Sequence, residues 1–284
     1  MTSQGNENLA LRAAELCRLG RPHIGFGLKE WNSEIMASLR LSKTYADITL
    51  VGPETIKNIH DFETVCAEEP ERKLAAMLAC NHVEGIVRGT IDCFKTYEAY
   101  RDLTGESSEL ILNLLETPQG HQFFISPMSN PEGWEKSERL QLALDISEFL
   151  ESWGLEPCIA VLTGERHETY SKKKTHDGGV TRTLNKTYED AEWIVDQLRE
   201  RKYSAKNWVI ESNVAISSGC NVLIEPNGMV GNQVARMLMA CGGRMLSATR
   251  LRLSRFYEEN SRTERNFLFH VKWLVALINQ SKVV

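Results

Sequence analysis

The chain has 284 residues, with 33 Lys and Arg against 38 Asp and Glu and a formal net charge of −5. Hydrophobic residues make up 42% of it, which excludes a chain that is mainly disordered. The acidic balance argues against a dedicated nucleic-acid binder, because such proteins need excess positive charge to displace counterions. The length allows one large domain or two linked ones.

Membrane, secretion and metal signals are weak. No run of about 18 apolar residues predicts a transmembrane helix, and the polar start, residues 1–10, lacks the apolar core of a secretory signal. The seven cysteines contain no C-x-x-C, so we expect reduced, mostly buried thiols in a cytoplasmic protein and no oxidised-thiol chemistry. Cys80 and His82 lack a second ligand pair, so no metal site is predicted.

Short apolar runs alternate along the chain with longer amphipathic stretches. Strands are expected at His23–Gly27, Ala46–Gly52, Val83–Gly89, Gln122–Ser126, Pro157–Thr163, Asn207–Ile210 and Asn221–Glu225. Most of these runs are continuously apolar, as in strands covered on both faces. Helical periods lie between and after them, at residues 140–153, 191–198 and 267–278. The alternation predicts an α/β protein with mainly parallel sheets flanked by helices.

A turn cluster suggests how the chain divides. Thr117–Gly120 reads Thr-Pro-Gln-Gly just before a new strand, which is typical of a boundary. We expect a first lobe at residues 1–118, completed by the C-terminal helix at 255–284, and a second lobe at 119–254. Ligands usually bind between domains, so a cleft between the lobes is the expected site.

A polar, basic stretch follows the predicted strand at 157–163. Residues 166–183 contain two glycines and Lys172–Lys174, and they predict a mobile loop. The lysines could attract a phosphate, but a run of charges is more often a solvated surface.

The strongest local signal lies at residues 221–241. The strand ends at Glu225-Pro226, an Asn-Gly turn follows, and Gly231-Asn232 opens the predicted helix. Glycines at such a crossing let backbone amides approach a ligand, and the helix start favours an anion. The alternative is that the turn is ordinary and Gly231 only relieves packing.

A second signal precedes the C-terminal helix. Ser261-x-x-Glu264 has the form of a capping box, in which Ser261 is the helix N-cap. Arg262 and Arg265 would then lie in the first turn, where cations oppose the helix dipole. Their presence favours an anion bound at this helix start.

Arg88 provides a third signal, because it follows the predicted strand Val83–Gly89 at the end where α/β proteins bind ligands. An ion pair with Glu84 or Glu211 is the alternative role for Arg88.

Together these three segments resemble the phosphate acyltransferase family of phosphotransacetylases and phosphotransbutyrylases. The family pattern of Pro-Asp, Gly-Asn and a later Lys is matched, with Asn for Asp and Arg for Lys, by Pro226, Asn227, Gly231, Asn232 and Arg236. Ser261-Arg262 matches the family's Ser-Arg pair, and Val83–Thr90 resembles its Asp-Gly-containing segment. The resemblance implies a two-lobed, phosphotransacetylase-like fold, as in isocitrate and isopropylmalate dehydrogenases.

The same resemblance implies site roles. Ser261 and Arg262 would be catalytic, with Arg262 holding phosphate and Ser261 donating to the oxyanion. The substrate-binding residues would be Gly231, Asn232, Arg236, Asn227 and Arg88. The family's Asp, seven residues after the Ser, is Leu268 here, so Glu264 or His270 would have to serve as base.

Two segments, Ile224–Leu238 and Tyr257–Ile278, are similar to the MtxX family of methanogenic archaea, described as methyltransferase subunit X. That resemblance implies a group transferase acting with other Mtx subunits, with a methylated pterin or corrinoid carrier. Two alternatives stay open. One is a phosphate acyltransferase, a homodimer by analogy, moving an acyl group between coenzyme A and phosphate; the other is a non-catalytic member that binds an anionic metabolite.

Overall fold

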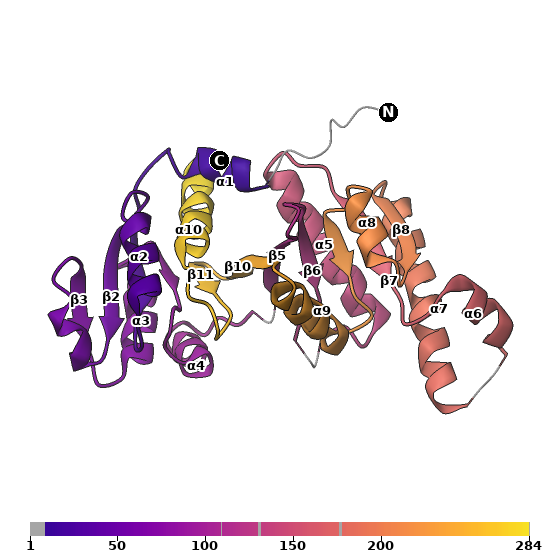
Figure 1. Ribbon diagram of the computed structural model, residues 1–284, viewed down its shortest axis with the longest axis horizontal. Coiled ribbons are helices and arrows are strands. Elements are labelled where there is room, and N and C mark those ends of the chain that lie inside the picture. The colour runs from indigo at the N-terminus through magenta and orange to yellow at the C-terminus, as the bar shows by residue number, and fades with distance from the viewer. Residues whose placement is uncertain (1–8, 109, 130–131, 176–177, 284) are drawn as a thin grey trace. The chain divides into compact units, whose positions relative to one another are not determined.

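The computed structural model describes residues 9–108, 110–129, 132–175 and 178–283 (Figure 1). It divides into two compact units. The terminal unit comprises Leu9–Leu112 and Met245–Val284, and the central unit comprises Asn113–Arg244. Strands alternate with helices in both, which confirms the predicted α/β class with mainly parallel sheets. The first eight residues, part of the stretch read as lacking a signal, lie outside the described residues.

The terminal unit holds strands in the order β3-β2-β1-β4-β11-β10. They are β1 (His23–Gly27), β2 (Asp47–Gly52), β3 (Glu63–Cys66), β4 (Gly85–Val87), β10 (Arg244–Arg250) and β11 (Phe256–Glu259). All pairs are parallel except β10 with β11. The helices are α1 (Leu9–Leu16), α2 (Ser33–Ser42), the 3₁₀ turn η1 (Glu54–Asn58), α3 (Pro70–Ala79), α4 (Cys93–Thr104) and α10 (Leu268–Ser281).

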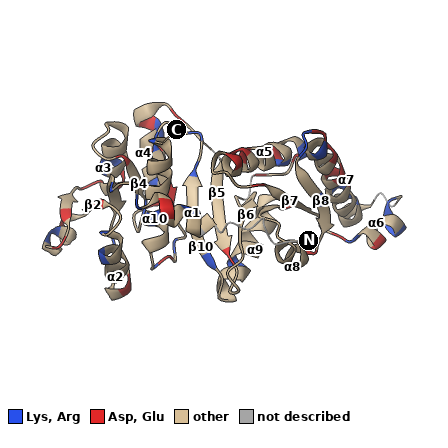
Figure 2. Cartoon of the chain, turned by 90° about the horizontal axis from the view of Figure 1, so that it is seen from above, with Lys and Arg blue, Asp and Glu red and all other residues tan. Residues whose placement is uncertain are grey.

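Helices cover both faces of this sheet, with α3 and α4 on one face and α2 and α10 on the other (Figure 2). The strand register shows why the strands read as continuously apolar. Gly25 of β1 lies beside Ile86 of β4, and a Cβ on Gly25 would meet Leu74 of α3. A Cβ on Gly85, one position earlier on β4, would instead meet Leu274 of α10. Successive residues therefore face different helices, and both sets are apolar.

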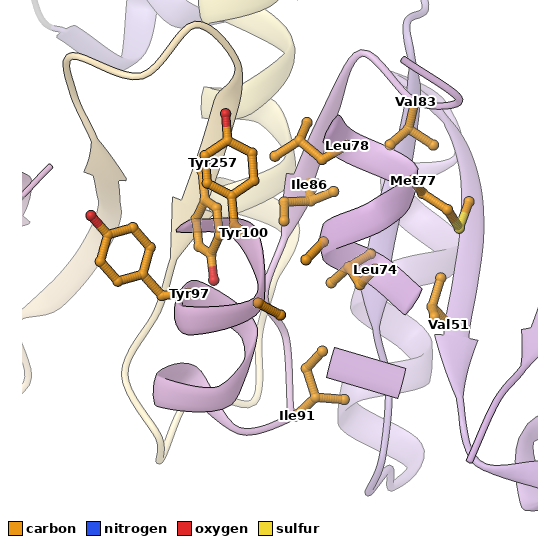
Figure 3. Packing of buried hydrophobic residues seen from close by; sticks show 12 residues of the cluster. Val51, Leu74, Met77, Leu78, Val83, Ile86, Ile91, Tyr97, Tyr100 and Tyr257 are labelled. Carbon is orange, nitrogen blue, oxygen red and sulfur yellow. The ribbon is translucent and has the colours of Figure 1, made fainter. Parts of the chain in front are cut away.

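A buried cluster fixes α4 against the sheet (Figure 3). Tyr257 of β11 meets Tyr97 and Tyr100 of α4 edge to face, with ring centroids 6.1 Å apart in each pair. Ile86 and Leu74 are fully buried in the same cluster. Aromatic pairs of this geometry contribute about 0.5–1.5 kcal/mol each beyond their buried area. The start of α4 is held firmly in consequence.

The central unit orders its strands β5-β6-β9-β7-β8. They are β5 (Ile111–Glu116), β6 (Gln122–Ser126), β7 (Cys158–Leu162), β8 (Ser204–Val209) and β9 (Val222–Ile224). The helices are α5 (Lys136–Ser152), α6 (His167–Lys173), α7 (Gly179–Glu200), α8 (Ser212–Ser217) and α9 (Gly228–Ala240). Helices α5 and α7 pack on one face, and α8 and α9 on the other (Figure 2).

The turn cluster Thr117–Gly120 closes the antiparallel hairpin of β5 and β6, where Thr117 N–H donates to the His121 carbonyl. The chain passes between the units at Leu112/Asn113 and again at Arg244/Met245. Both crossings precede the boundaries expected at 118/119 and 254/255. The ligand cleft expected between the lobes stays a prediction.

The loop predicted at residues 166–183 is wrong for most of its length. It contains α6 and the start of α7, while residues 176–177 lie outside the described part. Glu168 in the first turn of α6 and two lysines in its last turn suit the helix dipole (Figure 2). Tyr170 also stacks on Tyr188 of α7 with centroids 4.2 Å apart. Charge placement and one aromatic contact thus make a helix from a polar sequence.

Within the described ranges, no helix is both long and apolar enough to cross a membrane.

All seven predicted strands are present, and β3, β5, β10 and β11 are additional.

Candidate functional site

A pocket of about 360 Å³ lies in the terminal unit, where the carboxyl ends of the parallel strands β1, β4 and β11 meet. This is the edge at which open α/β sheets bind ligands. The chain leaving β1 supplies Lys29, that leaving β4 supplies Arg88, and that leaving β11 supplies Arg262. The rest of the lining is Glu30, Trp31, Asn32, Ile35, Thr90, Ile91, Asp92, Cys93 and Arg265.

Arg88 forms the base of the pocket and is only 3% exposed. Its Nε donates to Glu259 at 3.2 Å, Nη1 donates to the carbonyls of Gly89 and Ile91, and Nη2 donates to the Asn260 carbonyl at 2.5 Å. The ion-pair alternative for Arg88 is therefore correct in kind, but the partner is Glu259 and neither Glu84 nor Glu211. With four N–H groups engaged, Arg88 chiefly holds the loops after β4 and β11 together.

Asn260 ties these two loops a second time. Its side chain accepts from Gly89 N–H at 3.0 Å and donates to the Gly89 carbonyl at 3.0 Å. Gly89 has a φ of +65°, and a Cβ there would lie 2.1 Å from the Gly27 carbonyl oxygen. Only glycine fits this position. The sequence did not single out Asn260, because a lone Asn after a polar strand carries no motif.

Three cations border the pocket, and none is buried. Arg262 lies 3.7 Å from the Cys93 sulfur and over the Phe94 ring at 5.5 Å, while Arg265 donates to the Glu264 carbonyl at 2.8 Å. Lys29 follows β1 and lies far from the two arginines in the sequence. The sequence predicted Arg262 and noted Arg265, but it missed Lys29, which follows β1 without any motif.

Two acids share the pocket with these cations. Asp92 caps α4 by accepting from Lys95 N–H at 3.0 Å, and that bond lowers the pKa of the Asp92 carboxyl. Glu30 is exposed at the rim. Because the Asp92 carboxylate serves the helix cap, the cations remain the main charge available to a ligand.

The predicted capping box is wrong. Helix α10 begins at Leu268, so Ser261 lies in a preceding turn, where its Oγ accepts from Thr263 N–H at 3.3 Å. Arg262 therefore lies in that turn and Arg265 in the irregular segment that follows it, so neither opposes a helix dipole. Ser261 is half-buried and is not among the residues that line the pocket.

Glu264 and His270 are engaged with each other and with the core. His270 is fully buried, its Nδ1 lies 2.7 Å from Glu258, and its Nε2 lies 3.8 Å from Glu264. Burial opposes the charge, but the hydrogen bond to Glu258 and the nearby negative charge of Glu264 prevail and raise the pKa of His270 to about 9. The pKa of Glu264 is lowered despite its burial, by His270 and two backbone amides. Both groups are charged at neutral pH.

The other predicted residues form a separate group in the central unit. Helix α9 begins at Gly228, and Asn227 is its N-cap, accepting from Val230 N–H at 3.0 Å. The prediction that Gly231-Asn232 opens the helix is therefore wrong. Gly231 N–H already donates to the Asn227 carbonyl, so it is not a loop amide aimed at a ligand.

Close packing explains Gly231. A Cβ there would lie 2.0 Å from the Pro127 carbonyl oxygen, so the glycine lets α9 approach the segment after β6. Asn232 donates to the Met128 carbonyl at 3.1 Å and accepts from Arg236 Nε at 2.7 Å. The packing alternative for this segment is the one that its contacts match.

Glu225 is a chemically unusual residue that the sequence analysis passed over. It directly follows β9, is 3% exposed, and its Oε1 has no hydrogen-bond partner among the described residues. Burial raises the pKa of this carboxyl to about 7. Its position at the carboxyl end of an apolar strand was the signal available.

No group of three or more His, Cys, Asp or Glu side chains in the described residues could hold a metal ion.

Comparison with known sequences gives relatives over most of the chain. "Putative methyltransferase mtx subunit X" from Methanosarcina barkeri is 28% identical over 230 residues, 80% of this chain and 82% of that protein. The protein of the same name from Methanosarcina mazei is also 28% identical, over 80% of this chain and 79% of its own length. No protein-family model matches the chain.

Solved structures agree on the fold. A branched-chain phosphotransacylase from Enterococcus faecalis aligns with a TM-score of 0.62 at 13% identity, over 90% of this chain and 99% of that one. A phosphotransacetylase from Streptococcus pyogenes aligns with a TM-score of 0.63 at 12% identity, over 98% and 100%. The chain thus has the phosphotransacetylase-like fold expected from its sequence, and its similarity to methyltransferase mtx subunit X proteins is confirmed.

Proposed function

We propose that this chain is the anion-binding subunit of a group-transfer system and that it acts in methyl transfer together with partner chains. The observation that carries the proposal is the terminal-unit pocket, where Lys29, Arg262 and Arg265 surround a floor fixed by Arg88. The name of the Methanosarcina relatives, a methyltransferase subunit, supports the class of reaction and the need for partners.

The chemistry of the pocket suits a substrate that carries phosphate or carboxylate. Guanidinium groups bind such anions with paired, charge-assisted hydrogen bonds. Arg262 and Arg265 are exposed and both line the pocket from the segment between β11 and α10, so a single anion can bind to both. Trp31 is 39% exposed beside them and offers a flat apolar surface to the remainder of the substrate.

The engaged state of Glu264 and His270 favours a partner-dependent reaction. Acyl transfer by this chain alone needs a base to take the thiol proton of coenzyme A. His270 is buried and already protonated, and the low pKa of Glu264 makes it a weak base. Neither is poised for that task, so we assign the chain the binding step and a partner the chemistry.

The test combines native purification with an activity assay. Methyl transfer from methylated carriers is measured with the chain alone and with the chains that co-purify from native cells. We expect transfer only in the complex, lost in Arg262→Ala and retained in Arg21→Ala, whose side chain makes a surface ion pair with Asp47 away from the pocket.

Arsenate-driven breakdown of acyl-coenzyme A thioesters is the opposing assay. Arsenate replaces phosphate and makes acyl transfer irreversible, so even slow transfer becomes visible. Breakdown by the chain alone, lost in Arg262→Ala, would overturn the proposal in favour of a self-sufficient phosphate acyltransferase. Anion binding without transfer in either assay would leave a non-catalytic binding protein.

A further inference from the structure

Two cysteines far apart in sequence meet at the amino edge of the central unit. Cys158 begins β7, and Cys220 lies just before β9, its parallel neighbour. Their sulfur atoms are 3.2 Å apart. A disulfide bond is about 2.05 Å long, so bond formation needs the two sulfurs to approach by only about 1 Å. The expectation that thiol oxidation could be set aside rested on spacing along the chain, which does not reveal this pair.

The backbone around the pair is held in place by Asn221. Its side chain accepts from Cys158 N–H at 2.8 Å and donates to the Glu156 carbonyl at 2.9 Å, while its own N–H donates to the Cys158 carbonyl at 3.1 Å. Both cysteines therefore stay in register, and the short sulfur–sulfur distance belongs to the sheet edge itself. A preset geometry of this kind lowers the cost of closing a disulfide.

The two thiols differ in access. Cys158 is partly exposed and lines a pocket of about 520 Å³ at the starts of β7 and β8, whereas Cys220 is 4% exposed and is not part of the lining. The hydrogen bond from Cys220 lowers the pKa of Cys158 to about 7, and the same contact, with burial, raises the pKa of Cys220. An accessible thiolate beside a protected thiol is the arrangement of an attacking and a resolving cysteine.

The remaining lining is polar and carries charges of both signs. The exposed side chains of Lys202, Glu151 and Glu156 border the pocket beside Cys158, together with Ser204, Ser217 and Ser218. The ammonium group can receive a carboxylate from a bound molecule, and the two carboxylates can receive an ammonium group. The ligand that fits this lining is a small disulfide that carries both carboxylate and ammonium groups.

We propose that Cys158 and Cys220 form a thiol–disulfide exchange site for a small zwitterionic disulfide bound in this pocket. The Cys158 thiolate attacks one sulfur of the bound disulfide, forms a mixed disulfide and releases one thiolate. Cys220, losing its proton to solvent, then attacks the Cys158 sulfur and releases the second. The protein dithiol is oxidised to the Cys158–Cys220 disulfide, and one small disulfide is reduced to two thiols.

The test uses the reduced, folded full-length chain and oxidised glutathione as the probe. Remaining thiols are alkylated at intervals, and each cysteine-containing peptide is followed by mass spectrometry. We expect the Cys158–Cys220 disulfide to form with release of two equivalents of glutathione. Attack at Cys158 should be about tenfold faster than at the exposed Cys80 and Cys241, because the hydrogen bond with Cys220 favours the Cys158 thiolate. Equal rates, or glutathione retained on Cys158 of the wild type, would overturn the proposal.

Variants separate the two roles. Cys220→Ser should stop at the mixed disulfide on Cys158, and Cys158→Ser should leave Cys220 unreacted because it is buried. Reaction of Cys220 at the wild-type rate in Cys158→Ser would contradict the assignment. Lys202→Ala should slow the reaction with oxidised glutathione and leave unchanged that with the uncharged hydroxyethyl disulfide; equal slowing of both would refute recognition of a carboxylate by Lys202. The wild-type experiment stands even if a variant fails to fold.

Discussion

The carboxyl edges of the two sheets treat buried charge in opposite ways. In the terminal unit the charges are paired: Arg88 and Arg250 share Glu259, and His270 binds Glu258. In the central unit Glu225 is buried with one oxygen unpartnered among the described residues, as are both oxygens of Glu165. At the paired edge, the exposed cations of the pocket are not needed to neutralise its buried acids. The unpaired edge stores an electrostatic cost instead.

Residues that match the family pattern therefore do not have the same kind of role in the two units. The terminal unit keeps a polar pocket around Arg262, whereas the matching residues of the central unit, Gly231 and Asn232, are used to dock α9 on the segment after β6. Of the residues that match the family pattern, Arg262 therefore lines a pocket in one unit, while Gly231 and Asn232 make packing contacts in the other.

Replacing Arg88 should have the largest effect on the stability of the paired edge. Arg88→Met should lower the free energy of unfolding by about 3–5 kcal/mol, because Glu259 and three carbonyls lose a buried donor. Arg21→Met, which breaks an exposed pair with Asp47, should cost less than about 1 kcal/mol. Urea unfolding of both variants checks this. Equal, small losses would show that the Arg88 network does not stabilise the edge.

Glu225→Gln tests the electrostatic cost of the unpaired edge. Burial raises the pKa of Glu225 from 4.5 to about 7, so the folded state holds the proton more tightly than the unfolded state does. The protonated carboxyl of Glu225 therefore contributes fully to the free energy of unfolding below pH 4.5. As the pH rises through about 7 this contribution is lost, and the free energy of unfolding falls by about 3 kcal/mol in all. Glu225→Gln has no proton to lose and should gain on the wild type across this window. A constant difference between pH 4 and 8 would disprove the raised pKa.

The paired edge has its own pH window. The pKa of His270 is raised from 6.5 to about 9 by Glu258 and Glu264, so this contribution is complete below pH 6.5 and is lost as pH rises through about 9. The total is about 3 kcal/mol. Nuclear magnetic resonance of the His270 ring should show it protonated at pH 8. A neutral ring at that pH would contradict the pairing.

The packing role of the central unit is tested by Gly231→Ala. The added Cβ would meet the Pro127 carbonyl oxygen at 2.0 Å, so α9 must shift, at a cost of about 1–3 kcal/mol. Gly178→Ala is the matched control, because its Cβ would meet nothing within 4 Å. Thermal unfolding of the pair decides between packing and a ligand-facing glycine. No loss in Gly231→Ala would remove the packing explanation.

The strands found from the sequence are those with unbroken apolar runs, such as β1, β6 and β7. Strands β10 and β11 escaped detection because they carry buried polar residues, among them Thr249 and Glu258, whose partners come from α10. A run interrupted by Glu reads as a surface segment until its buried partners are known. Strand β3 is a short edge strand with only partly buried residues, so it too gave no apolar signal.

Site residues were predictable where a motif marked them, as with Arg262. Lys29 lines the pocket, whereas Glu259 and Asn260 bind Arg88 at its base. Sheet order supplies these residues, because β1 and β11 both lie beside β4 although they are far apart in sequence. Cys158 and Cys220 meet for the same reason. Helix starts were the weakest predictions: Ser261 was expected to cap the C-terminal helix and Gly231-Asn232 to open the helix after β9, but a local turn uses Ser261 and close packing explains Gly231.

Calorimetric titration with inorganic phosphate tests whether the terminal-unit pocket binds an anion through Arg262. Wild type and Arg21→Ala should bind with the same affinity, and Arg262→Ala should bind about tenfold or more weakly, since it loses charge-assisted hydrogen bonds. Sulfate should compete, whereas a neutral sugar should not. Equal phosphate affinity in all three proteins would contradict anion binding through Arg262.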